Sequence, residues 1–165
     1  MKTEQMSEKK SLLSFNLGKE IFAIPVNKVL EVLEMHKITS VPKMPEHIKG
    51  VINFRGEILP VIDTRIKFKL PDISDTSKTV IIVLDLINNG KSLILGAVAD
   101  SVRDVFEVYD QDIKAVPELS VRYKAEFLHG IIKIGEDFIM LLDIEKVFSL
   151  EDVDVISEVK EALVS

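Results

Sequence analysis

One pattern occurs twice in this chain of 165 residues, and it limits the folds that the chain can adopt. The stretch 50–68 reads GVINFRGEILPVIDTRIKF, and the stretch 130–148 reads GIIKIGEDFIMLLDIEKVF. They align without a gap, each with an apolar run, a turn with glycine, a second apolar run, an aspartate and a short tail. This order predicts a strand, a hairpin turn, a strand and a helical turn capped by the aspartate. The repeat indicates a fold built twice from one small unit.

The two copies differ most at the hairpin turn. The first copy has Phe54-Arg55-Gly56 where the second has Ile134-Gly135-Glu136, so Arg55 has no counterpart. Asp63 and Asp143, in contrast, occupy the same position in both copies, as expected of helix-capping residues that the architecture requires. Arg55 is therefore the first candidate for a functional residue.

The repeat extends upstream of both copies. Residues 12–17 and 20–25 predict a hairpin that turns at Gly18, and residues 79–87 and 92–98 predict another that turns at Asn88–Lys91. Between hairpin and repeat, helical spacing predicts a helix of about two turns over 26–34. The apolar positions behind that prediction are Val26, Val29, Leu30 and Leu33, and the same spacing recurs at Val98, Val102, Val105 and Phe106. Pro60, inside the second apolar run, predicts a sheet edge or a bulge.

The ends and the middle of the chain differ from the repeated units. Residues 1–10 are polar and are expected to be a disordered lead-in, and the polar stretch 69–78 is a linker between a first unit (11–68) and a second (79–148). Residues 149–165 predict a C-terminal amphipathic helix with a structural role. Ser149 with Asp152 resembles a capping box, and the apolar stripe consists of Val153, Ile156, Val159 and Leu163.

Composition and motifs argue against several classes of protein. The formal net charge of −6 argues against nucleic-acid binding, and the absence of cysteine excludes disulfides and thiolate metal sites. His36, His47 and His129 lack the spacing of metal ligands, so we expect no metal and no cofactor. No nucleophile elbow, phosphate-binding loop or dinucleotide fingerprint occurs, so we expect no catalytic residues and no enzyme. Without a membrane-spanning or signal-like apolar run, we expect a soluble cytoplasmic protein.

The run GVINFRG at 50–56, followed by Pro60-Val61-Ile62-Asp63-x-Arg65, resembles the signature of the CheW family of bacterial chemotaxis coupling proteins. The segments VNKVLEV at 26–32 and VADSVRDV at 98–105 look like its other hallmarks, so the resemblance covers residues 12–148. Phe54 departs from the family, which commonly has leucine there. The resemblance implies a mostly β fold of two five-stranded SH3/OB-like barrels sharing a core, with short helices. Whether strands are exchanged between the barrels stays open.

The resemblance also implies a function. CheW-like proteins are non-enzymatic adaptors that join the cytoplasmic tips of methyl-accepting chemotaxis receptors to the regulatory domain of the histidine kinase CheA, in arrays at the inner face of the membrane. By resemblance, the receptor-binding residues are Val29, Glu31, Val32, Gly50 and Arg55. Candidate kinase-binding residues, one face on each barrel, are Thr79, Val80, Lys114, Glu118 and Leu119. Core packing is the alternative role for Val29 and Val32. For Lys114 and Glu118 the alternative is a solvated loop, and for Leu119 it is a loop anchor.

Other functions stay open on the sequence. An OB-like barrel that binds single-stranded nucleic acid would need a basic groove with exposed aromatic residues, and the acidic charge argues against it. A CheW-like regulatory module of another two-component pathway, or a regulatory fragment of a kinase, would share the same motifs.

Overall fold

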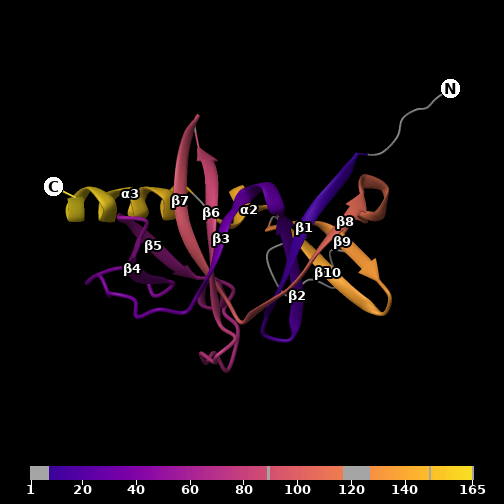
Figure 1. Ribbon diagram of the computed structural model, residues 1–165, viewed down its shortest axis with the longest axis horizontal. Coiled ribbons are helices and arrows are strands. Elements are labelled where there is room, and N and C mark those ends of the chain that lie inside the picture. Colours follow the sequence, from indigo (N-terminus) through magenta and orange to yellow (C-terminus); the bar gives the residue numbers. More distant parts are fainter. Residues whose placement is uncertain (1–7, 89, 117–126, 149, 165) are drawn as a thin grey trace.

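The computed structural model describes residues 8–88, 90–116, 127–148 and 150–164, which form two five-stranded sheets (Figure 1). The strands of the first sheet, in spatial order, are β8 (Ser101–Tyr109), β1 (Lys9–Leu17), β2 (Glu20–Pro25), β10 (Asp137–Leu142) and β9 (Leu128–Ile134). Those of the second are β3 (Val29–Glu34), β6 (Val80–Asn88), β7 (Lys91–Ala99), β5 (Glu57–Asp63) and β4 (Ile48–Phe54).

Each sheet combines strands from both repeats. The hairpin β1–β2 of the first repeat joins β8, β9 and β10 of the second, and β6–β7 of the second joins β3, β4 and β5 of the first. Of the four strand pairs that join the repeats, β2–β10 and β5–β7 are parallel, and β1–β8 and β3–β6 are antiparallel like the hairpins. Neither repeat therefore forms a barrel from its own strands alone.

One isolated bridge closes each sheet into a barrel. Thr39 pairs with Val51 of β4, and Lys114 pairs with Ile131 of β9. The glycine before each paired strand residue makes this close approach possible. A Cβ atom on Gly50 would lie 2.0 Å from the Thr39 carbonyl oxygen, and one on Gly130 would lie 2.8 Å from that of Lys114. The recurrence of glycine at these positions thus has one architectural cause.

The largest apolar cluster lies between the two barrels. It includes Phe15 and Phe22 from the first sheet and Ile62 and Ile82 from the second. Smaller clusters fill the barrel interiors, one around Leu12, Ile132 and Leu141 and the other around Ile52, Leu59 and Val83. The prediction of two barrels that share a core is confirmed.

The helices are short apart from the last. They are η1 (Val26–Lys28), α1 (Thr64–Lys67), η2 (Asp110–Asp112), α2 (Ile144–Val147) and α3 (Leu150–Val164). Helix α3 packs against β5 and buries Ile156 and Val159, while Leu163 at its end is exposed. The capping role expected of Ser149 lies outside the described residues.

The predicted helix over 26–34 is wrong. Only the η1 turn is helical, and residues 29–34 form β3, which pairs antiparallel with β6. Burial along β3 alternates, with Leu30, Val32 and Glu34 exposed. Apolar residues lie on both faces of β3, Leu30 and Val32 on one and Val29 and Leu33 on the other, so the sequence shows no strand period; tertiary pairing with β6 decides the structure.

Two related expectations are also corrected. The helical spacing from Val98 to Phe106 belongs to the end of β7 and to β8, which are strands. Pro60 lies in β5, which is an interior strand rather than an edge. The parallel pairing of β5 with β7 begins only at Val61. Pro60 lies before these hydrogen bonds, so its lack of an N–H group does not interrupt them.

The start of the first strand differs slightly from the expected boundary. Strand β1 begins at Lys9, inside the stretch expected to be a lead-in, and residues 1–7 lie outside the described part. In the described ranges, no helix is both long enough and apolar enough to cross a membrane.

Candidate functional site

The turn that has no counterpart in the second repeat forms the tip of the β4–β5 hairpin. Phe54 pairs with Glu57, and the two residues between them, Arg55 and Gly56, have φ angles of 52° and 82°. Positive φ at both central residues is typical of the type I′ hairpin turn. Glycine adopts it freely, whereas an arginine there is held in a sparsely populated conformation.

The Arg55 side chain has two partners. Its Nη2 donates to Oε1 of Glu31 at 2.7 Å, and its guanidinium carbon lies 4.8 Å from the ring centroid of Phe54. The pair is open to solvent, since 67% of the Arg55 side chain and 39% of that of Glu31 are exposed. The structure thus joins two of the residues assigned to receptor binding, from β3 and from the hairpin tip.

The other three residues assigned to receptor binding differ in exposure. Val32 is exposed on the outer face of β3, together with Leu30, which the sequence analysis missed because a helical period placed it in the core. Val29 packs against the cluster between the barrels. Gly50 is buried at the barrel closure, which accounts for its lack of a side chain.

The residues assigned to kinase binding lie on both barrels. Thr79 is buried, and its Oγ1 accepts a hydrogen bond from the Thr76 N–H at 2.8 Å. Val80 lies opposite Glu34 of β3, so it adjoins the outer face that carries Val32. Lys114 is exposed at the closure of the other barrel, where its Nζ donates to the Gln111 carbonyl at 2.9 Å. Glu118 and Leu119 lie outside the described residues.

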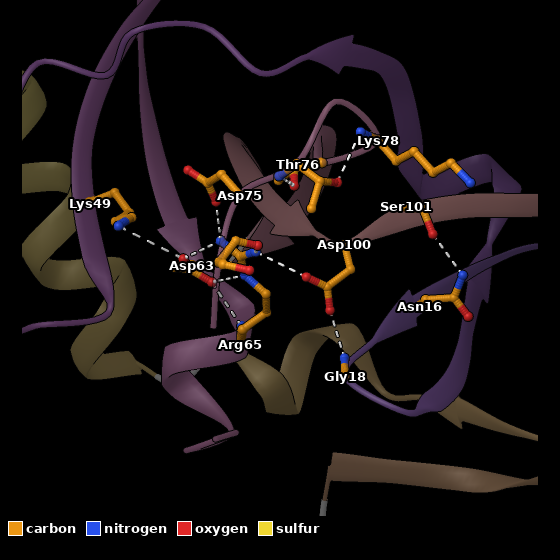
Figure 2. A network of polar contacts seen from close by, with 12 residues as sticks. Asn16, Gly18, Lys49, Asp63, Arg65, Asp75, Thr76, Lys78, Asp100 and Ser101 are labelled. Carbon is orange, nitrogen blue, oxygen red and sulfur yellow. Dashed lines mark hydrogen bonds and ion pairs between the residues drawn. The ribbon is translucent and has the colours of Figure 1, made fainter. Parts of the chain in front are cut away.

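The second half of the signature forms a buried ionic cluster around Arg65 (Figure 2). Arg65 is 1% exposed, and Nε and Nη2 each donate to one oxygen of Asp63 at 3.0 Å. Nη2 also donates to Asp75 at 2.7 Å, and Nη1 donates to Asp100 at 2.9 Å and to the Ser74 carbonyl at 3.1 Å. Burial opposes the charge on the guanidinium, but the hydrogen bonds that it donates to three carboxylates raise the pKa of Arg65 above its ordinary value.

This cluster connects distant parts of the fold. Asp63 ends β5, Asp75 belongs to the connection between α1 and β6, and Asp100 lies between β7 and β8. The second oxygen of Asp100 accepts from the Gly18 N–H at 2.6 Å, in the turn between β1 and β2 of the other barrel. All five N–H groups of Arg65 are used within the chain, so the pocket of about 310 Å³ beside it gains no free donor from this side chain.

The capping prediction holds for one of the two repeated aspartates. The Asp63 carboxylate accepts from the Arg65 N–H at 3.0 Å and caps α1. Asp143 occupies the N-cap position of α2, but its side chain makes no capping hydrogen bond. In the second repeat Glu145 stands where the first has Arg65. Asp143 is therefore followed two residues later by an acidic side chain, whereas Asp63 is followed by a basic one.

A third polar cluster attaches α3 to the base of the β4–β5 hairpin. Asp152 is buried, with one oxygen 2.7 Å from Nε2 of His47 and the other 2.5 Å from Nζ of Lys67. Burial alone would raise the pKa of the Asp152 carboxyl, but the contacts with Lys67 and His47 outweigh it and lower that pKa. Within the described residues no three His, Asp or Glu side chains are grouped so as to hold a metal ion.

The model of the CheW-like domain matches residues 11–152. This chain belongs to the CheW family. The match covers all ten strands except the first two residues of β1, and it ends within the first turn of α3.

Relatives in this family cover nearly the whole chain. The chemotaxis protein CheW of Klebsiella aerogenes is 37% identical over 150 residues, which are 91% of this chain and 88% of that protein. The chemotaxis protein CheW of Bacillus subtilis is 30% identical, over 90% of this chain and 93% of that protein. Among solved structures, the scaffolding protein TtCheW of Thermoanaerobacter tengcongensis has a TM-score of 0.77 at 27% identity, over 88% of this chain and 96% of that chain.

Proposed function

We propose that this CheW-family chain is a non-enzymatic adaptor that couples methyl-accepting chemotaxis receptors to the histidine kinase CheA. Its relatives are named chemotaxis proteins, and the solved neighbour is named a scaffolding protein. The observation that carries the proposal is the exposed Glu31–Arg55 ion pair beside the exposed Leu30 and Val32.

The chemistry of this surface suits a helical partner. The receptor tips implied by the family are helical hairpins, and a helix docks on an apolar strip with a polar rim. Leu30 and Val32 supply an apolar strip on one face of β3, and Arg55, paired with Glu31 between them in sequence, supplies a polar group at the edge of the same strand. The guanidinium can exchange the Glu31 carboxylate for a receptor carboxylate, which it binds through paired N–H groups.

The kinase contacts belong to the same proposal. Val80 in one barrel and Lys114 at the closure of the other are the candidates that lie in the described part of the chain. Faces on separate barrels allow one adaptor to bridge two kinase regulatory domains. In that arrangement the adaptor is recruited to receptor arrays at the inner face of the membrane.

Reversing the charge at the hairpin tip tests the receptor site. We expect Arg55→Glu to leave circular dichroism unchanged, because the side chain is exposed, and to abolish capture of the protein by an immobilised receptor cytoplasmic fragment. Arg103→Glu is the matched control. Arg103 is also exposed, and its Nη2 lies 3.7 Å from Oδ2 of Asp137; both residues belong to the barrel that does not carry Arg55. Capture of Arg55→Glu at the wild-type level would refute the assigned site.

A charge swap separates recognition from maintenance of the turn. The double variant Glu31→Arg/Arg55→Glu restores an ion pair between β3 and the hairpin tip but inverts its polarity. If Arg55 recognises a receptor carboxylate, the swap does not restore capture. Recovery of capture by the swap would show that the pair only holds the turn.

A further inference from the structure

The ring of Phe54 lies beneath the charged group of the candidate receptor site. The Arg55 guanidinium carbon is 4.8 Å from the Phe54 ring centroid, within the range of a cation–π contact. Arg55 follows Phe54 directly, and in the turn with positive φ at Arg55 the two side chains are in contact. The ring and the Glu31 carboxylate thus hold the guanidinium from two directions.

Packing fixes the ring itself. Phe54 is half-buried and packs against the apolar cluster inside the second barrel, which includes Ile52 and Leu59. An arginine with most of its side chain in solvent would otherwise sample many rotamers, and binding a partner would cost it that freedom. A ring anchored in the barrel core limits the rotamers before any partner arrives.

The second repeat provides an internal comparison. Ile134 stands where the first repeat has Phe54, and Gly135 stands where it has Arg55, so the tip of the β9–β10 hairpin lacks both the ring and the cation. That hairpin has a looser contact elsewhere, with Nζ of Lys133 5.8 Å from the ring centroid of Phe138. Phe54 and Arg55 therefore occur together, in one repeat only.

We propose that Phe54 is a positioning residue that holds the Arg55 guanidinium at the hairpin tip in the orientation that receives a receptor carboxylate. This inference rests on the proposed function, because it gives Arg55 a partner outside the chain. When the receptor carboxylate displaces Glu31, the ring keeps the guanidinium at the rim. The identity of residue 54 thereby sets how strongly this adaptor binds a given receptor.

The free protein gives the first test, which needs no receptor. We expect the Arg55 Nε–H proton of the wild-type protein to be shifted upfield by the ring current of Phe54 in ¹H–¹⁵N NMR spectra. Phe54→Leu removes the shift, and Phe54→Tyr, which keeps the ring, retains it. An Arg55 signal that is the same in all three proteins would overturn the proposal.

Receptor binding gives the second test. We expect Phe54→Leu to weaken binding of a receptor cytoplasmic fragment about two- to fivefold, the range of an exposed cation–π contact. Phe54→Tyr should bind like the wild type. Phe138→Leu, which removes the ring of the other hairpin, is the control and should also bind like the wild type.

The outcomes separate this inference from the proposed function. If Arg55→Glu abolishes binding but Phe54→Leu binds like the wild type, only the positioning role fails. If Phe54→Tyr is as weak as Phe54→Leu, the loss comes from core packing and the positioning role also fails. If Arg55→Glu has no effect on binding, the proposed receptor site itself fails.

Discussion

One glycine, which has no side chain, allows each barrel to close. Gly50 has a φ of 145° and Gly130 lies at the equivalent place, and each lets a distant segment approach the strand backbone. Gly50 was assigned to receptor binding by resemblance, but its burial and its duplicate give it an architectural role. Arg55 shows the opposite combination, since it is exposed and occurs once.

Substitution at the barrel closure should be costly. We expect Gly50→Ala to lower the free energy of unfolding by more than about 2 kcal/mol, because the new Cβ must displace backbone rather than a flexible side chain. Gly135→Ala is the control: its φ is 60°, but no atom lies within 4 Å of the added Cβ. It should cost only about 1 kcal/mol of backbone strain. Urea denaturation measures both, and equal losses would contradict the role of close approach.

At the scale of elements, α3 depends on charge as well as apolar packing. Its Asp152 contacts His47, which precedes β4, and Lys67, which ends α1 just after β5. The carboxylate thus joins both ends of the hairpin that carries Arg55 at its tip. In Figure 1 the helix and this hairpin extend in the same direction from the core between the barrels.

This contact makes stability depend on pH. Because the folded protein lowers the pKa of Asp152 below its ordinary value of 3.8, the contact stabilises the fold fully above pH 3.8. That stabilisation is lost as pH falls through the folded pKa. We expect the wild type to exceed Asp152→Asn in unfolding free energy at pH 7, and the difference to shrink below pH 3.8. Urea titrations of both proteins at a series of pH values measure it, and a constant difference would refute the contribution.

At the scale of the whole molecule, the exchange of hairpins makes the two repeats interdependent. Strand β1 pairs with β8 from the other repeat, and residues from both repeats fill the core between the barrels. The Arg65 cluster lies where this exchange occurs, and Asp100 extends it to the first hairpin through Gly18 (Figure 2). The Asp-x-Arg part of the signature therefore has a structural role in joining the barrels.

Removal of the buried cation should destabilise both barrels together. We expect Arg65→Met to cost about 3–5 kcal/mol, because Asp63 stays fully buried and is left with the distant ion pair with Lys49, whose Nζ is 4.0 Å away. Arg103→Met is the control, since its ion pair with Asp137 is exposed and should contribute less than about 1 kcal/mol. Chemical denaturation followed by probes in each barrel measures the losses. A loss of similar size in both variants would show that burial of Arg65 is unimportant.

The sequence by itself determined the repeat and the hairpins, and its motifs carried the family resemblance that implied a shared core. These follow from local patterns: glycine at turns, apolar runs of strand length and a motif that keeps its spacing. It also made Arg55 a candidate functional residue, because a residue absent from one of two copies is not required by the architecture. The alternation of burial along β3 was hidden because apolar residues lie on both faces of the strand.

Only the tertiary structure decided which distant residues meet. The pairing of Glu31 with Arg55, the three carboxylates around Arg65, and the contact of Asp152 with His47 and Lys67 join segments from different elements. The exchange of β1–β2 and β6–β7 between barrels is likewise a choice of strand partner. Local sequence sets which segments become strands, but partners are chosen by the burial and charge that become available when the whole chain packs.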